Sequence, residues 1–146
     1  MSFIHQEFGT VVLRVRLQNL EPLYCTASGK AVLAFLPEEY RDDLLSACEF
    51  KPYTKNTITN ISDLLKELNT IRKQGYASDN CELYDGVYCI AAPVYMNCGW
   101  PLFSIGISTV HRTENHLESY AQIVRQTAKQ LSDKFQAQFG DNNMKV

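Results

Sequence analysis

The fold is decided by residues 87–110, whose sequence is VYCIAAPVYMNCGWPLFSIGISTV. Two runs within it, Val87–Tyr95 and Leu102–Val110, are rich in apolar and β-branched residues, and such runs favour β-strands. Between them, the segment 97–99 (Asn-Cys-Gly) supplies turn residues that suit a hairpin. We therefore expect two antiparallel strands joined by a tight connection.

The second strand of this hairpin alternates between large and small side chains, which point to opposite faces. The large ones are Phe103, Ile105, Ile107 and Thr109. The small ones are Ser104, Gly106 and Ser108. The small, polar row is either a ligand face, with room and hydrogen-bonding groups, or an ordinary solvent face. Cys89 on the first strand can share that face, although a lone cysteine is more often a small buried apolar residue.

Two short helices are predicted before the hairpin. The first covers Thr26–Leu36, and Pro37 ends it because proline disfavours helix in the residue before it. Pro37 then suits the first turn of the second helix, in which Leu44 and Leu45 are expected to be buried. Further upstream, the apolar and β-branched residues of Met1–Arg16 favour a strand.

Two longer helices are also predicted. Ser62 is expected to cap one whose apolar residues recur at helical spacing, and Gly75 ends it. The other runs from about Glu114 to Phe139 and has its own apolar stripe. The polar stretch Ser78–Gly86 precedes the strands of the hairpin. Since nothing repeats and no linker divides the chain, the pattern indicates one α+β domain, an antiparallel sheet with helices packed on it.

Composition and charge exclude several classes of function. The chain has 146 residues, with 14 basic residues scattered among 16 acidic ones, whereas DNA binding needs clustered basic side chains. No apolar run approaches the roughly 18 residues that span a bilayer. The 5 cysteines are odd in number and widely spaced, which favours free thiols in a reducing compartment. We expect a cytoplasmic protein that binds neither DNA nor membrane through this chain.

The segment 26–30 (TASGK) is the second feature that can carry chemistry, because it lies at the start of a predicted helix. Backbone N–H groups at such a position bind anions, and small residues let a ligand approach. The alternative is plain N-capping by Thr26 or Ser28. The segment is not a nucleotide phosphate loop, because Ala31 stands after Lys30 where that motif needs Ser or Thr.

Metal and thiol chemistry receive little support from the sequence. Cys81, Cys89 and Cys98 have seven and eight residues between them, unlike the tight pairs of structural zinc sites. Cys89 with His111 or His116 is the arrangement left for a thiol enzyme, and no activating signature surrounds it. We predict no catalytic residue, no metal and no cofactor.

Several ordered segments carry a resemblance to a known family. Residues 22–34 (PLYCTASGKAVLA) are followed by Thr57-Ile58-Thr59, by 72–76 (RKQGY), and by Glu82–Gly86 leading into Val87–Val94. The segment 105–108 (IGIS) and the long final helix complete the pattern. Together they resemble the effector-binding domain of IclR-type bacterial transcription regulators over roughly residues 10–140.

The resemblance implies a GAF-like fold, a curved antiparallel sheet with a ligand pocket on one face. It implies a sensor of a small metabolite, a carboxylate or a sugar acid, that assembles as a homodimer or tetramer. The resemblance implies that DNA is bound only through an N-terminal helix-turn-helix domain, and we expect this chain to lack that domain. We expect residues 1–146 to be a single effector-binding domain that also lacks its first helix and strand. The alternative is an oligomerisation module with a vestigial pocket.

The resemblance also assigns ligand-binding positions. These are Ala27, Ser28, Asp79, Cys89, Gly106 and Ser108. The backbone N–H groups of Ala27 and Ser28 are expected to hold a ligand carboxylate. Ser108 and Cys89 are expected to donate hydrogen bonds, and Asp79 to accept one from a ligand hydroxyl. Gly106 departs from relatives that carry serine there, which enlarges the pocket or changes its ligand.

Overall fold

Four helices and three strands make up the residues that the structure describes, which are 21–96, 98–110 and 114–139 of a computed structural model. They are α1 (Ala27–Leu33), α2 (Glu38–Ser46), α3 (Ile61–Gln74), β1 (Ala77–Asn80), β2 (Tyr88–Tyr95), β3 (Pro101–Thr109) and α4 (Glu114–Phe139). This content confirms the predicted α+β class. The strand expected at Met1–Arg16 lies outside the described residues.

The three strands form one antiparallel sheet in the order β1-β2-β3. β2 and β3 are the predicted hairpin, with Ala91 opposite Gly106 and a register irregularity between Val94 and Tyr95. β1 was not predicted, because the strand has only 4 residues, most of them polar, and lies in a stretch rich in turn-forming residues. It forms because the free edge of β2 offers a ladder of backbone hydrogen bonds, which outweighs weak local strand propensity.

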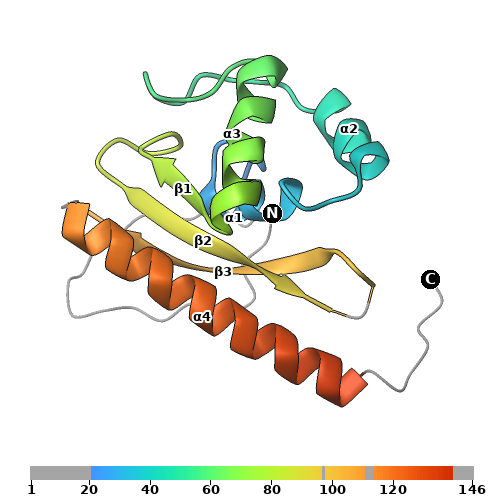
Figure 1. Ribbon diagram of the computed structural model, residues 1–146. Coiled ribbons are helices and arrows are strands. Elements are labelled where there is room, and N and C mark those ends of the chain that lie inside the picture. The colour runs from blue at the N-terminus through green and yellow to red at the C-terminus, as the bar shows by residue number, and fades with distance from the viewer. Residues whose placement is uncertain (1–20, 97, 111–113, 140–146) are drawn as a thin grey trace.

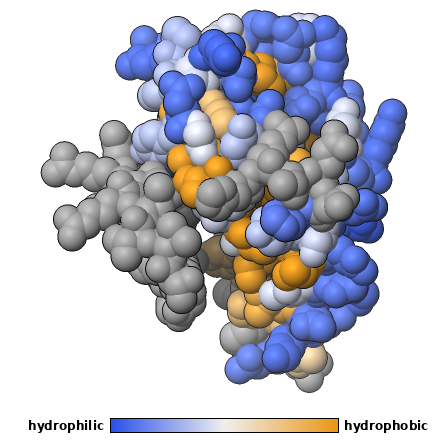
Figure 2. Space-filling view, turned by 90° about the vertical axis from the view of Figure 1, so that its left-hand side faces the viewer, coloured by the Kyte–Doolittle hydropathy of each residue, from blue (hydrophilic) through white to orange (hydrophobic). Residues whose placement is uncertain are grey.

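Helices cover both faces of this sheet (Figure 1). α4 packs along one face, mainly on β2, whereas α1 contacts all three strands from the other face and α3 packs behind it. Under α4 the buried apolar residues are Ile90, Ala92, Val94, Ala121, Val124 and Ala128. The predicted apolar stripe of α4 is confirmed, since its larger members pack against this cluster. Figure 2 shows hydrophobic residues on one face of the molecule, with hydrophilic residues at the top and along the right-hand edge of the view.

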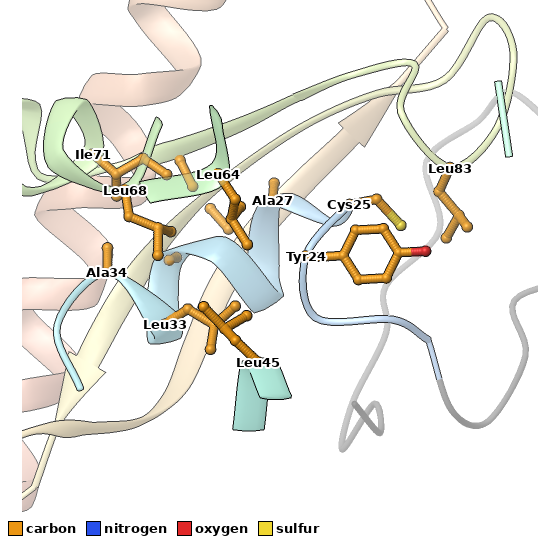
Figure 3. Packing of buried hydrophobic residues seen from close by; sticks show 13 residues of the cluster. Tyr24, Cys25, Ala27, Leu33, Ala34, Leu45, Leu64, Leu68, Ile71 and Leu83 are labelled. Carbon is orange, nitrogen blue, oxygen red and sulfur yellow. The ribbon is translucent and has the colours of Figure 1, made fainter. Parts of the chain in front are cut away.

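A second apolar core lies on the α1 side of the sheet (Figure 3). There Ala27 and Leu33 of α1 meet Leu64, Leu68 and Ile71 of α3, all nearly inaccessible to solvent. Burial of these side chains fixes α1 between the sheet and α3, at roughly 25 cal/mol for each Å² of apolar surface removed from water. This packing determines where the start of α1 lies relative to the strands.

Some predicted helix details are wrong. The N-cap of α3 is Asn60, whose side chain accepts a hydrogen bond from the Asp63 N–H at 2.9 Å, so Ser62 lies inside the helix. In α2, Leu45 is buried as expected, whereas Leu44 is 42% exposed because α2 presents only a narrow face to the core.

Candidate functional site

Asp79, Cys89 and Ser108 lie side by side on three neighbouring strands, and we call them the polar row. The strand register places Asp79 opposite Cys89, and Cys89 opposite Ser108. Residues directly opposite each other in an antiparallel sheet project to the same face. Cys89 Sγ and Ser108 Oγ are 3.2 Å apart, within hydrogen-bonding distance for sulfur. The structure thus brings together three of the predicted ligand-binding residues.

The polar row lies on the face that α1 covers, with Gly106 beside it. Ile105 and Ile107 pack with the α4 cluster, while Gly106 and Ser108 are exposed, so the predicted alternation of β3 is confirmed. A Cβ atom on Gly106 would lie 2.8 Å from the Ile90 carbonyl oxygen. A serine at this position therefore requires a local backbone shift, and glycine keeps the surface beside Ser108 open.

Asp79 is the acidic member of the polar row and is only 5% exposed. Its Oδ1 accepts a 2.6 Å hydrogen bond from the Glu82 N–H. Burial raises the pKa of the Asp79 carboxyl to about 6; the nearby Glu82 also raises it, whereas the backbone hydrogen bond and Lys30 lower it. Close to neutral pH this carboxyl therefore exists in both protonation states.

Cys89 is half-buried in the centre of the polar row, with a thiol that stays protonated. Burial raises the pKa of Cys89 to about 12, against the lowering effect of its hydrogen bond to Ser108. Nucleophilic cysteines need the opposite shift, because the thiolate is the reactive form. The environment of Cys89 therefore suits a hydrogen-bonding group and disfavours a thiol enzyme. Of its two possible histidine partners, His111 lies outside the described residues.

The start of α1 is capped by Thr26. Of the two capping residues that the sequence offered, Thr26 and Ser28, the N-cap is therefore Thr26. Thr26 Oγ1 accepts a hydrogen bond from the Gly29 N–H at 3.1 Å, and the Lys30 N–H donates to the Thr26 carbonyl oxygen. Helix geometry leaves the N–H groups of Ala27 and Ser28 without an acceptor inside the helix. Ala27 itself is buried in the core and Ser28 is half-buried.

Behind the polar row lies a buried ion cluster that the sequence did not reveal. Lys30 on α1 is fully buried, and its Nζ lies 2.5 Å from Glu82 Oε1 and 3.3 Å from Glu67 Oε1. Glu82 Oε2 is buried without a hydrogen-bond partner. In the sequence, Lys30 falls at helical spacing from the apolar Ala27 and Ala34, which are buried as well. This spacing was the one signal in the sequence that Lys30 would be buried.

The turn that carries Glu82 is held in a strained conformation by the connector between α2 and α3. Cys81 has a φ of 57°, unusual for a residue with a side chain. Thr54 Oγ1 donates to the Cys81 carbonyl oxygen at 2.6 Å, and Thr57 Oγ1 donates to the Glu82 carbonyl oxygen at 2.6 Å. Such strain persists only where the surroundings over-determine it, and it is concentrated at functional sites.

The part of the chain that the structure describes has neither a metal cluster nor a membrane-spanning helix. No group of three or more His, Cys, Asp or Glu side chains there is placed to hold a metal ion. All 5 cysteines are free thiols, as the sequence analysis predicted. None of the helices in that part of the chain is long and apolar enough to cross a membrane.

Comparison with known proteins connects this arrangement to a family. The family model described as "Bacterial transcriptional regulator IclR C-terminal" matches residues 1–133. The transcriptional regulator KdgR of Dickeya chrysanthemi is 35% identical over 136 residues, which cover 90% of this chain and 45% of that protein. The chain spans about half the length of the curated relatives it matches, 45% and 51% for two KdgR proteins.

Solved structures agree with this match. The Thermotoga maritima IclR structure is 40% identical with a TM-score of 0.80, covering 87% of this chain and 52% of that one. The inducer-binding domain of PobR from Acinetobacter, solved as a double mutant with 3-hydroxybenzoic acid, is 26% identical with a TM-score of 0.71. That match covers 82% of this chain and 73% of the PobR domain.

Proposed function

The chain belongs to the family formed by the C-terminal domain of IclR-type bacterial transcriptional regulators, and we propose that it senses a small carboxylate or sugar acid. The family consists of transcription regulators and not of enzymes, in line with the absence of an activated nucleophile in the polar row. Effector binding would adjust DNA binding by an attached helix-turn-helix domain in the cytoplasm.

The observation that carries this proposal is the polar row and its surroundings. Three hydrogen-bonding side chains lie across the sheet on the face opposite α4, beside an exposed glycine. Ser108 and Cys89 provide donors for a carboxylate, and the start of α1 adds the N–H groups of Ala27 and Ser28. PobR, a relative with the same fold, is known with an aromatic hydroxy acid bound, which supports the chemical class.

The regulatory step follows from where the site lies. A ligand between α1 and the sheet contacts two packed elements at once, so it stabilises one relative placement of them over another. A differential affinity for two such placements is enough to shift a population of homodimers or tetramers. We propose this shift as the output that an attached DNA-binding domain would read.

A thermal-shift screen with small carboxylates and sugar acids tests the proposal. A ligand at one hundred times its Kd adds about 2.7 kcal/mol of stability, which such a screen detects readily. We expect at least one hit, which is lost in Ser108→Ala and in Ala27→Leu. A flat screen on a well-folded sample would contradict effector sensing.

A second candidate function is assembly alone, with the pocket vestigial. It is favoured by exposed apolar side chains on α2, where Tyr40 is 53% and Leu44 42% exposed. The Tyr40 ring lies 5.8 Å from the Trp100 ring, so this patch continues onto the β2–β3 connection. Sedimentation analysis separates the two functions, because an assembly module forms the same oligomer with and without every carboxylate tested.

A further inference from the structure

Buried acids outnumber buried bases around the polar row. Among the described residues, Lys30 is the buried cation of this region, and Glu82 and Glu67 already share its ammonium group. Glu82 Oε2 nevertheless remains buried without a donor. Asp79 forms no ion pair within that part of the chain; its Oδ1 accepts from the backbone N–H of Glu82, and its carboxyl also shares a side-chain hydrogen bond with Cys89. Among the residues that the structure describes, the cluster therefore holds more acidic than basic groups.

The carboxyl of Asp79 interacts electrostatically with titratable groups on several neighbouring elements. The groups concerned are Glu82 on the following turn, Lys30 on α1, Glu21 and Cys25 before α1, and Cys89 on β2. Lys30 is the one cation among these. Burial dominates, and the raised pKa of about 6 leaves Asp79 within reach of a proton at physiological pH.

We propose that an anionic effector binds the polar row together with one proton from solvent, which Asp79 takes up. The inference rests on the function proposed above and specifies its ligand chemistry. An anion next to Ser108 and Cys89 lies within two strand spacings of Asp79, roughly 10 Å or less. Because Asp79 is buried, water screens its negative charge poorly from a bound anion, and Lys30 is already occupied, so a proton on Asp79 is what removes the repulsion.

The hydrogen bonds at Asp79 favour this protonation. Because Oδ1 accepts from the Glu82 N–H, the proton belongs on the other carboxyl oxygen. A protonated Asp79 has an O–H donor in place of an acceptor, so the polar row gains one hydrogen-bond donor for the anion. Protonation of Asp79 therefore favours anionic effectors selectively. A neutral analogue of the same shape is not repelled by the Asp79 carboxylate, so protonation does not raise its affinity by removing repulsion.

Calorimetric titration at pH 6, 7 and 8 tests the proposal. The probes are 3-hydroxybenzoate, pyruvate and D-gluconate, each compared with its neutral amide. For a carboxylate that binds, we expect Kd to rise about tenfold or more between pH 6 and pH 8, because the protonated fraction of Asp79 falls. Titrations in two buffers of different ionisation enthalpy should show the uptake of about one proton at pH 8. The neutral amides should bind without proton uptake.

Two variants assign the effect to Asp79. Asn retains an oxygen for the Glu82 N–H and adds a permanent N–H donor, so Asp79→Asn should bind the carboxylate with no pH dependence. It should bind more tightly than the wild type at pH 8. The matched control is Asp85→Asn, since Asp85 is exposed in the loop between β1 and β2 and should keep the wild-type pH profile.

The outcomes separate the two proposals. A carboxylate that binds with the same Kd at pH 6 and pH 8, or a pH dependence that survives in Asp79→Asn, overturns proton-coupled binding and leaves effector sensing intact. Failure of all three carboxylates to bind at pH 6 overturns proton-coupled binding and counts against carboxylate sensing itself.

Discussion

The two faces of the sheet are built from the same three strands but differ in chemistry. The α4 face is closed by apolar side chains, with Ser132 as a buried polar residue that donates to the Ala128 carbonyl oxygen and accepts from the Tyr95 N–H. The α1 face combines an apolar core with the buried Lys30, the buried Glu82 and the polar row that contains the buried Asp79. Buried charge is costly to maintain, so its concentration on one face indicates a function there, while the other face provides stability.

The largest effect is expected from breaking the buried ion cluster. Lys30→Met leaves Glu82 as a buried carboxylate without its cation, and removal of one partner of a buried pair costs about 3–5 kcal/mol. Urea unfolding at pH 7.5 measures this loss. The double variant Lys30→Met with Glu82→Gln should recover much of it, because the buried carboxylate at 82 is then replaced by a neutral group and the Glu67 carboxylate, 31% exposed, still reaches solvent. Equal stability of the single and double variants would contradict this account of the α1 face.

The α4 face should respond to volume and not to charge. Ile90 is 3% exposed beneath α4, and truncation of a buried isoleucine to alanine costs about 2–4 kcal/mol. Ile90→Ala should lose the same free energy of unfolding at pH 5.5 and at pH 7.5, since no titratable group replaces the lost contacts. A loss that changes strongly with pH would show that the two faces are coupled.

A smaller effect is expected from the charge of Asp79. Its folded pKa of about 6 lies above the ordinary aspartate pKa of 3.8, so deprotonation disfavours the folded state. Stability is therefore lost as pH rises from about 4 to 6, and the penalty is fully present above that range. Between pH 5 and pH 7.5 the contribution of Asp79 should amount to about 1 kcal/mol of lost stability. Chemical unfolding of wild type, Asp79→Asn and Asp85→Asn at both pH values measures this contribution. The change in the free energy of unfolding between the two pH values should become smaller in Asp79→Asn alone.

The smallest stability effect is expected at the exposed end of the polar row. Ser108 is exposed, and substitutions at such positions usually change stability by less than about 0.5 kcal/mol. Ser108→Ala should therefore unfold like the wild type while losing the thermal shift caused by carboxylate ligands. Loss of several kcal/mol in this variant would assign Ser108 to the structure of the sheet.

The elements that the sequence predicted well are those with a regular pattern. The hairpin of β2 and β3 and the helix α4 follow from alternation and helical periodicity, both of which are local signals. β1 escaped prediction because its pairing partner, and not its own composition, makes it a strand. The N-cap of α3 was misplaced by two residues, since Asn60 and Ser62 are both good capping residues.

The candidate site also contains residues that the sequence indicated and residues that it did not. Small and polar residues on β3 indicated a possible ligand face from alternation alone, with Cys89 on the neighbouring strand as a possible member, and the family resemblance added Asp79. The pair of Lys30 and Glu82 was beyond reach, because the two residues are 52 positions apart and no local pattern relates them. Their contact depends on how α1 packs on the sheet and how Thr54 and Thr57 hold the turn at Glu82.

The central claim, that one face of the sheet binds and the other supports, is tested most directly by measuring ligand affinity in a matched pair of variants on neighbouring residues of β3. Ile107→Val removes a methyl group from the α4 side, and Ser108→Ala removes a hydroxyl from the α1 side. Calorimetry with the carboxylate that gives the strongest thermal shift should show at least a tenfold loss of affinity in Ser108→Ala, and wild-type affinity in Ile107→Val. Equal affinities in the two variants, or a loss confined to Ile107→Val, would contradict the account.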